Sequence, residues 1–232
     1  MKKIISIILL AILGMFFFNI VSAINFGSNI KKGSVSEHYI EKGINENRGS
    51  NLVTSIVVNY RGFDTLGEVT VLFLAATGLS FLLFSCKCRR EFDKVISSLV
   101  LRTATSTLYP LILLFGAYIF IHGHLTPGGG FQGGAVIASG VMLLFMSFRN
   151  FNINHRELST IESLAGISFV ALGLAGLIVS NSFLANKLLP LGNWNALFSA
   201  GVIPLIYIAV GFKVGSELSG LISDMISSTK ED

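Results

Sequence analysis

Long hydrophobic runs separated by short polar stretches dominate the pattern along this chain. Each run approaches the roughly 20 residues that an α-helix needs to cross the hydrocarbon core of a bilayer. The runs predict six membrane-spanning helices, at about Ile4–Val21, Leu66–Phe84, Leu108–Ile121, Phe131–Phe148, Ile161–Val179 and Phe198–Phe212, and the last run can continue to Ile222. We therefore expect an all-α integral membrane protein.

The composition supports a membrane-embedded protein. Only 13% of the 232 residues are charged, against about 25% in a typical soluble domain, and the mean hydropathy is +0.71. The 24 glycines fit the same interpretation, because glycine lets helices pack closely in a bilayer. The net charge of +4 is too small to indicate nucleic acid as a partner.

The first run admits two interpretations. MKKIISIILLAILGMFFFNIVSA has the basic start, apolar stretch and small-residue end of a cleaved secretory signal. Its apolar part is about 17 residues, longer than the 7–15 that is usual in such signals. A retained membrane anchor is therefore favoured.

The placement of basic residues predicts the topology, since Lys and Arg gather in cytoplasmic loops. Basic residues lie before the first run, after the second and after the fourth: Lys2, Lys3, Lys87, Arg89, Arg90, Lys94, Arg102, Arg149 and Arg156. Lys187 is the only charge between the fifth and sixth runs. We expect six crossings with both termini cytoplasmic.

The runs group into two units. Residues 1–90 form a two-helix unit with a polar outer loop, and residues 91–232 form a four-helix unit introduced by the amphipathic stretch EFDKVISSLVLR. Between them, Cys86 and Cys88 have the spacing of a metal-binding pair. No second cysteine pair or nearby histidine completes a site, so we expect reduced thiols, no metal site and no cofactor.

The stretch IHGHLTPGGGFQGGA, residues 121–135, interrupts the hydrophobic pattern between the third and fourth runs. Gly128, Gly130 and Gly133 match the dinucleotide fingerprint G-x-G-x-x-G, which also requires a preceding strand and a later acidic residue. Neither is present, so nucleotide binding is not expected. Instead we expect a compact turn at the outer membrane edge, shaped by Thr126, Pro127, Gly128, Gly129, Gly130, Phe131, Gly133 and Gly134.

Two histidines in this stretch are candidates for proton transfer, because imidazole titrates near physiological pH. These are His122 and His124. The alternative is that both are interfacial residues that hydrogen-bond to loop carbonyls. Their spacing leaves both interpretations open.

The stretch YRGFDTLGE, residues 60–68, gathers three ionisable residues at the outer end of the second run. Asp64 and Glu68 are one helical turn apart and share a face. They are candidates for an ion or proton path, since charges at membrane depth usually mark such paths. Equally, Thr65 and Glu68 match a capping box at a helix start, and Arg61 can pair with Asp64.

The stretch GFKVGSELSG, residues 211–220, places Lys213 and Glu217 one turn apart. Their position near the inner leaflet makes them further path candidates. The favoured alternative is that Lys213 extends its ammonium to the cytoplasmic surface. Gly211 and Gly215 have the small-residue spacing that permits close helix contact. No nucleophile–base pair or carboxylate pair suited to hydrolysis is apparent, so we do not expect an enzyme.

Two of these motifs resemble parts of one membrane complex. HLTPGGGFQGG followed by GFKVGSELSG, within about residues 95–222, resembles the B subunit of multisubunit cation/proton antiporters of the Mrp or Mnh type. NYRGFDTLGEVTVLFLAATG, residues 59–78, is similar to the C-terminal segment of the large A subunit of those complexes. The latter segment also occurs as a separate small subunit in archaeal membrane-bound hydrogenases. Here both are joined in one chain.

The resemblance implies a multi-pass subunit in the cytoplasmic membrane of a prokaryote, with Na⁺ and H⁺ as transported ions and other Mrp-type membrane subunits as partners. Asp64, Glu68 and His124 would then contribute to the ion path, while Pro127 and Phe131 hold the loop shape. A purely structural assembly subunit is the main alternative. A stand-alone transporter is less supported, because the two halves show no inverted-repeat symmetry.

Overall fold

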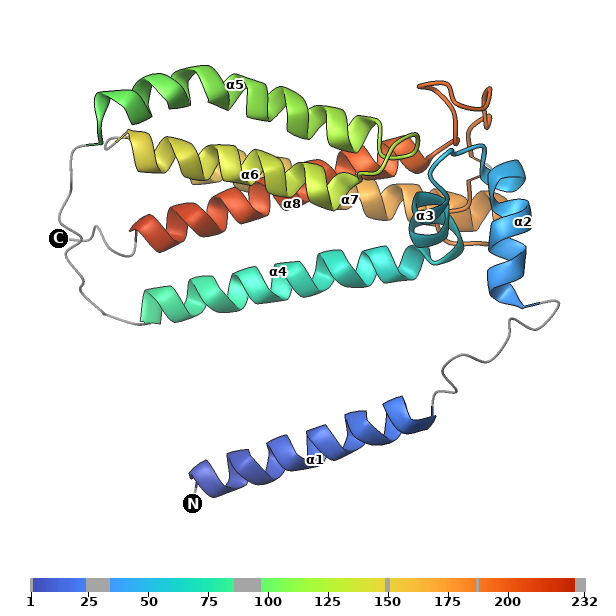
Figure 1. The fold of residues 1–232 in the computed structure, drawn as a ribbon, viewed down its shortest axis with the longest axis horizontal. Coiled ribbons are helices and arrows are strands. Elements are labelled where there is room, and N and C mark those ends of the chain that lie inside the picture. The colour runs from blue at the N-terminus through green and yellow to red at the C-terminus, as the bar shows by residue number, and fades with distance from the viewer. Residues whose placement is uncertain (1, 24–33, 86–96, 149–150, 187, 228–232) are drawn as a thin grey trace. The chain divides into compact units, whose positions relative to one another are not determined.

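The computed structural model describes residues 2–23, 34–85, 97–148, 151–186 and 188–227. The chain divides into two compact units, Met1–His38 and Tyr39–Asp232, each considered by itself. Six of the described helices are long and apolar enough to cross a membrane: α1 (Lys2–Ala23), α4 (Gly62–Ser85), α5 (Leu99–Ile121), α6 (Gly130–Ser147), α7 (His155–Ser180) and α8 (Ile203–Ser227) (Figure 1). The predicted all-α fold with six membrane-spanning helices is confirmed for these residues. The side on which the termini lie stays a prediction.

Several residues used in the topology prediction lie outside the described residues. They are Cys86, Cys88 and the basic residues between 87 and 94, together with Arg149 and Lys187. The division at residue 90 also stays a prediction.

The first unit contains α1, which is hydrophobic around its whole circumference between Ile4 and Ala23. A helix that is apolar on every side is suited to a lipid environment. Its cleavage or retention stays a prediction. The polar helix α2 (Val35–Asn47) begins in this unit and continues into the second.

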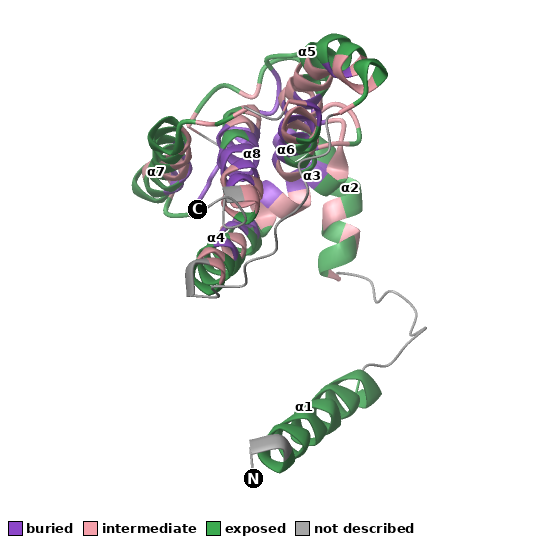
Figure 2. Ribbon diagram, turned by 90° about the vertical axis from the view of Figure 1, so that its left-hand side faces the viewer, coloured by how far each residue is buried: buried purple, intermediate pink, exposed green. Residues whose placement is uncertain are grey.

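Helix α8 is the centre of the second unit. It packs against α4, α5, α6 and α7, and 61% of its membrane-spanning window is buried, compared with 39% for α6 and 22% for α7. Figure 2 shows buried residues concentrated on α8 and on the faces turned toward it, with exposed residues around the outside. Because four helices cover most of α8, a charge on one of its covered faces is shielded from lipid, whereas Leu205 and Phe212 on its open face are exposed.

Glycines in α6 allow two helices to approach it closely. A Cβ atom on Gly133 would lie 2.7 Å from the carbonyl oxygen of Gly116 in α5. On the opposite face, a Cβ atom on Gly134 would lie 2.8 Å from the carbonyl oxygen of Gly211 in α8. Such separations are shorter than van der Waals contact, so these positions fit glycine alone.

The structure corrects the predicted extent of the glycine turn. Residues 122–129 form the loop, whereas Gly130, Phe131, Gly133 and Gly134 belong to the first turns of α6. Their role is helix packing: Phe131 contacts the hydrophobic core around α8. Gly129 ends the loop with a φ of +156°, which an L-residue rarely adopts.

Three helix boundaries also differ from the prediction. Helix α7 begins at His155, six residues before Ile161, where the Asn154 side chain accepts from the Arg156 amide. Helix α5 begins at Leu99, nine residues before Leu108, because the Ser98 side chain caps the Leu101 amide. Helix α8 begins at Ile203, after left-handed residues at Ala200 and Gly201, and continues to Ser227. These changes place Lys213 near the middle of a membrane-spanning helix.

Candidate functional site

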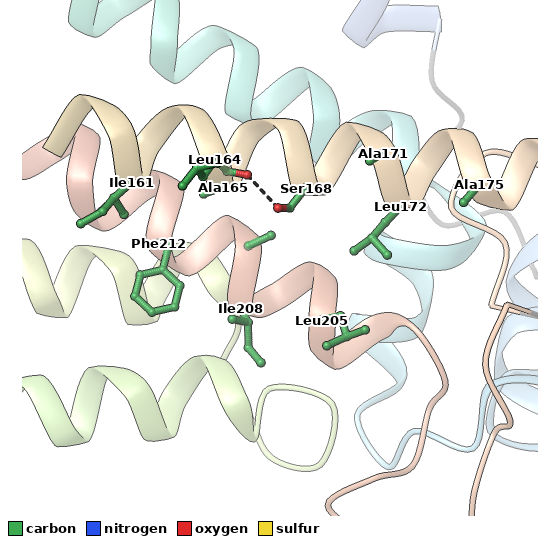
Figure 3. Close-up of a pocket in the computed structure, with 11 residues that line it drawn as sticks. Ile161, Leu164, Ala165, Ser168, Ala171, Leu172, Ala175, Leu205, Ile208 and Phe212 are labelled. Carbon is green, nitrogen blue, oxygen red and sulfur yellow. Dashed lines mark hydrogen bonds between the residues drawn. The ribbon is translucent and has the colours of Figure 1, made fainter. Parts of the chain in front are cut away.

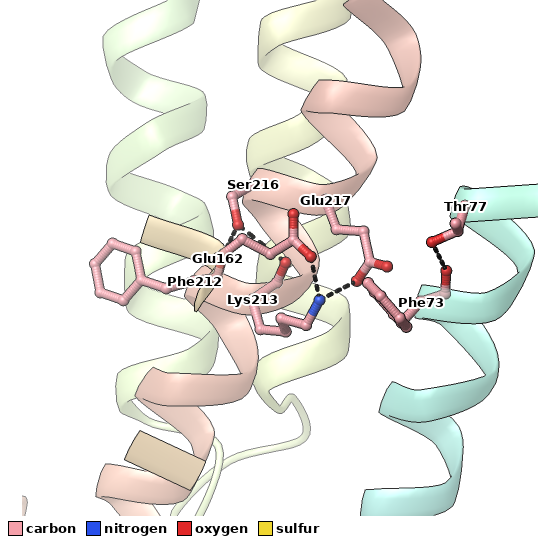
Figure 4. A network of polar contacts seen from close by, with 7 residues as sticks. All are labelled: Phe73, Thr77, Glu162, Phe212, Lys213, Ser216 and Glu217. Atoms are coloured by element: carbon pink, nitrogen blue, oxygen red, sulfur yellow. Dashed lines mark hydrogen bonds and ion pairs between the residues drawn. The ribbon is translucent and has the colours of Figure 1, made fainter. Parts of the chain in front are cut away.

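A buried ion cluster lies at the centre of the second unit. The Lys213 ammonium donates to Glu217 Oε2 at 3.0 Å on the same helix and to Glu162 Oε1 on α7 at 2.5 Å. Its Nζ also lies 5.0 Å from the centre of the Phe73 ring of α4, a cation–π distance. Figure 4 shows side chains from α4, α7 and α8 converging on this ammonium group.

The prediction that Lys213 extends to the cytoplasmic surface is wrong. Its residue surface is only 8% exposed, because α4 and α7 pack over that part of α8. Two carboxylates satisfy the ammonium inside the bundle, so it need not reach water. Glu162 was not among the predicted candidates, although it is the only charged residue in the fifth hydrophobic run.

The cluster carries more negative than positive groups. Two carboxylates face one ammonium, and Glu217 Oε1 is buried with no hydrogen-bond partner among the described residues. An unpaired charge in a low-dielectric environment is strongly unfavourable. The cluster is therefore electrically balanced when one further positive charge, such as a proton, joins it.

A polar pocket adjoins this cluster between α4, α7 and α8. Its volume is about 250 Å³, enough for several water molecules, and it continues from Glu162 and Glu217 to Asp224 and His155. Its lining side chains include the hydroxyl groups of Thr77, Ser80, Ser159 and Ser216. It thus joins the middle of α8 to the end of the bundle where α7 begins.

The far end of the pocket holds a second group of polar contacts. Ser80 donates to Asp224 Oδ2 at 2.7 Å, and His155 Nδ1 lies 3.7 Å from Asp224 Oδ1. His155 Nε2 also lies 3.2 Å from the Ser223 hydroxyl. These contacts link α4, α7 and α8 through titratable side chains. No set of three or more His, Cys, Asp or Glu side chains in the described part of the chain is arranged to hold a metal ion.

An apolar groove lies on another face of α7 and α8 and, unlike the polar pocket, is lined by no charged side chain among the described residues. It has a volume of about 760 Å³ and is lined by aliphatic side chains and Phe212 (Figure 3). Its single hydroxyl, Ser168, donates to the Leu164 carbonyl at 2.7 Å. A groove of this composition contacts lipid or a neighbouring helix and offers no ion path.

The glycine-rich loop is held by side chains from the segment that precedes α4. Asn51 Nδ2 donates to the carbonyl oxygens of Gly123 and Thr126, each at 3.0 Å. Thr54 donates to the same Gly123 carbonyl at 2.7 Å, and Tyr207 of α8 donates to Thr54 at 3.0 Å. These hydrogen bonds join the glycine-rich loop to the segment before α4 and, through Thr54, to α8. Asn51 and Thr54 were not predicted as site residues, since no pattern in the sequence indicates which loop they contact.

His124 is fully buried in this loop. Burial lowers the pKa of its imidazole, while the nearby backbone of Ala196 and Leu197 partly opposes that shift. Neither ring nitrogen makes a hydrogen bond of normal geometry among the described residues. His122 differs, since its ring stacks on Tyr118 and its Nδ1 lies 3.2 Å from the Tyr118 carbonyl oxygen. A role of either histidine in proton transfer stays a prediction.

The buried His124 predicts a pH-dependent stability. Below the ordinary value of 6.5, the unfolded chain binds a proton that the folded chain resists, so stability falls as the pH falls. We expect the free energy of unfolding to drop by up to about 1.4 kcal/mol per pH unit until the folded pKa is reached. The measurement is unfolding of the chain in detergent from about pH 7.5 down to about pH 5, the range in which histidine titrates. A His124→Asn variant should lose most of this slope, and His122→Asn is the control that should keep it.

The ionisable residues before α4 do not form a capping box. Helix α4 begins at Gly62, and Thr65 donates to the Val57 carbonyl at 2.9 Å, closing the junction with the preceding π-helix η1 (Ser55–Tyr60). That proposed role for Thr65 and Glu68 is therefore wrong. The Arg61–Asp64 ion pair is present at 2.5 Å.

Asp64 and Glu68 lie on the first turns of α4 and are both exposed in this chain. Glu68 is close enough to Tyr207 of α8 to interact with it electrostatically. Exposed carboxylates on a membrane-spanning helix require water or a partner protein beside them. The structure does not bring them into contact with the Lys213 cluster.

The helices from α5 to α8, with the glycine-rich loop between α5 and α6, make up the part of the chain that matches a known family. Residues 100–220 match the family described as a domain related to the MnhB subunit of Na⁺/H⁺ antiporters. The chain belongs to this family. Residues 3–107 match a second family, described as the E subunit of MBH. The fusion of a B-like and a smaller subunit, inferred from the motifs, corresponds to these two matches.

Three known proteins resemble this MnhB-related chain. A chain in the structure of the membrane-bound sulfane sulfur reductase, an archaeal respiratory membrane complex, is 42% identical with a TM-score of 0.76, over 97% of both chains. An uncharacterized protein of Methanocaldococcus jannaschii is 28% identical over 86% of this chain and 87% of its own length. The B subunit of the Na⁺/H⁺ antiporter of Bacillus subtilis is 37% identical over 38% of this chain, and the match spans 56% of that protein.

Proposed function

We propose that this chain is a subunit of an Mrp-type cation/proton antiporter or of the related module of a respiratory complex, and that it forms part of the ion path. The observation that carries this proposal is Lys213, buried near the middle of a membrane-spanning helix between Glu162 and Glu217. The family and the 42% identical chain of a respiratory membrane complex support the type of assembly. The chain itself catalyses no reaction, and its partners are other membrane subunits and the lipid bilayer.

The cluster has the composition of a proton-exchanging site. With both carboxylates ionised it carries one net negative charge, and with one proton added it is neutral. These two states differ from each other by one proton, and in both of them Lys213 stays charged and paired with a carboxylate. Burying charged groups at membrane depth costs free energy, and an apolar contact of similar size is often as stable as a buried ion pair. A purely structural role therefore does not require these charges.

The polar pocket provides the route from this cluster to one side of the membrane. Hydroxyl groups and Asp224 line it, and His155 stands at its end. The basic residues along the chain predict that this end is cytoplasmic. Water in the pocket would pass protons between Glu217 and His155 without a conformational change in the backbone.

At the opposite end, we propose that Asp64 and Glu68 attract cations or contact a partner subunit. Both are exposed and belong to a membrane-spanning helix. His124, buried in the loop that Thr54 and Tyr207 hold through their hydrogen bonds, is proposed as a proton-exchanging or loop-ordering group.

Ion flux through the assembled complex tests this function. We expect Glu162→Gln and Glu217→Gln each to lower sodium-dependent proton flux in membrane vesicles at least about tenfold, since each removes a group from the path. Glu157→Gln is the control, because Glu157 is exposed at the start of the same helix α7 and does not line the pocket. Wild-type flux in both test variants, at normal abundance of the complex, would contradict the path assignment. Glu68→Gln and His124→Ala test the other end in the same way.

A structural assembly subunit is the second candidate function. Asn51 and Thr54 hold the glycine-rich loop entirely through its backbone, which is a structural arrangement. This function predicts that substitutions affect flux only through reduced amounts of the partner subunits. Measuring the abundance of those subunits together with flux in each variant separates the two candidates.

A further inference from the structure

We propose that the polar pocket between α4, α7 and α8 binds one small monovalent cation, which competes with a proton for Glu217 Oε1. The inference rests on the proposed function, because it adds a binding site to the same path. The pocket adjoins the Lys213 cluster and has a volume of about 250 Å³. Such a volume accommodates a small cation together with part of its water shell.

The charge of the cluster indicates a cation. Glu162 and Glu217 together outnumber the single ammonium of Lys213. Glu217 is 5% exposed, and its Oε1 atom has no partner in the described part of the chain although Oε2 is bound to Lys213. Figure 4 shows this carboxylate between α8 and the α4 segment that carries Phe73. A buried carboxylate oxygen without a donor is stabilised by a positive charge placed beside it.

The hydroxyl groups of the pocket present oxygen lone pairs to such an ion. Thr77 donates its hydrogen to the Phe73 carbonyl at 2.8 Å, and Ser216 donates to the Phe212 carbonyl at 2.7 Å. Ser80 donates to Asp224 at 2.7 Å. Each hydroxyl hydrogen is thus directed to another acceptor. The oxygen atoms remain free to coordinate a hard cation, which prefers oxygen ligands.

The titratable groups around the site are few and come from two helices. His155 and Glu162 contribute from α7, and Lys213 and Asp224 contribute from α8 beside Glu217. Helix α4 contributes only hydroxyl groups and apolar side chains to the lining. A cation at Oε1 and a proton at Oε1 are mutually exclusive, so cation binding weakens as the pH falls.

Infrared difference spectra of the assembled complex in lipid test the proposal. Exchanging choline for sodium should change carboxylate bands in the wild type. Sodium is the probe, and choline is the control cation, because its fully methylated nitrogen cannot be coordinated directly by oxygen atoms. This change should disappear in Glu217→Gln and persist in Glu157→Gln. Where the carboxyl is mostly protonated, the half-saturating sodium concentration should rise about tenfold for each pH unit of acidification. An identical sodium-induced spectrum in Glu217→Gln, or no pH dependence, would overturn the proposal.

A second pair of variants keeps the test decisive if Glu217→Gln fails to assemble. Thr77→Val removes a pocket oxygen and leaves the Lys213 cluster intact, and we expect about a tenfold weaker response to sodium, as for one lost contact to a charged group. Thr70→Val is the matched control, because Thr70 lies on the same helix, donates to the Gly67 carbonyl at 2.8 Å and does not line the pocket. Equal sodium responses in Thr77→Val and Thr70→Val would also overturn the site.

Flux separates this proposal from the function on which it rests. If Glu217→Gln abolishes flux while the wild type shows no sodium-induced change, the path function holds and the cation site is wrong. If the sodium-induced change is lost in Glu217→Gln while flux is unchanged, the site holds and the path function is wrong.

Discussion

Replacing Lys213 by methionine should abolish sodium-dependent proton flux and also destabilise the protein. The substitution keeps the length of the side chain but leaves Glu217, with a side chain only 3% exposed, without its positive partner. Breaking a buried ion pair on one side typically costs about 3–5 kcal/mol. Glu162 is less affected, because its side chain is 26% exposed and faces the polar pocket. Flux in vesicles and the abundance of the complex are the two measurements.

The double variant Lys213→Met/Glu217→Gln distinguishes the electrostatic cost from the loss of function. It removes the stranded charge together with the lysine, so the abundance of the complex should recover while flux stays absent. If the double variant is as unstable as Lys213→Met alone, the cost lies in the lost contacts of the ammonium with Glu162 and the Phe73 ring rather than in the stranded charge of Glu217. Normal flux in Lys213→Met at normal abundance would show that the ammonium has no part in the path.

Replacing Gly134 by alanine should separate α6 from α8 and prevent normal assembly. The added Cβ atom would lie 2.8 Å from the Gly211 carbonyl oxygen, 2.8 Å from Val214 Cβ and 2.9 Å from the Gly215 amide nitrogen. Two of these are backbone atoms of a buried helix, which no side-chain rotation can move. Overpacking of this kind typically costs about 1–3 kcal/mol, and more when the backbone must shift. We expect a lower unfolding temperature of the chain in detergent and less assembled complex.

Gly78→Ala in α4 is the matched control for this prediction. A Cβ atom at Gly78 meets no atom of the described structure within 4 Å. Alanine also has a higher intrinsic helix propensity than glycine by about 1 kcal/mol. The unfolding temperature of the Gly78→Ala chain should therefore be unchanged or higher. Equal destabilisation by both substitutions would show that helix flexibility, and not contact between α6 and α8, determines the effect.

The number and position of the membrane-spanning helices were predictable, because hydrophobic length is a local property of the chain. The first, second and fourth helices lie where the runs predict them, and the fifth begins six residues before its run, at His155. The starts of the third and sixth helices differ from the prediction because they are set by local features that hydrophobicity does not indicate. A serine cap starts α5 at Leu99, and left-handed residues before Ile203 delay α8.

Some features of the candidate site were also predictable from the sequence, and others were not. Lys213 and Glu217 were predictable as a pair, since four residues form one helical turn. The favoured surface position of Lys213 was wrong, because the pattern does not reveal that α4 and α7 cover it. Gly130, Gly133 and Gly134 were predicted to shape a turn, whereas in the structure they belong to α6 and let α5 and α8, from different parts of the chain, approach it closely.

The sequence by itself determined the membrane class, the helices and the residue types that carry charge, because each depends on neighbours within one or two turns. Only the tertiary structure joined Glu162 to Lys213, 51 positions away, and Asn51 to Gly123, 72 positions away. Such contacts depend on how helices pack around α8. That packing decides whether a charge faces water, lipid or a partner, and it turned a lysine predicted at the surface into the centre of a buried ion cluster.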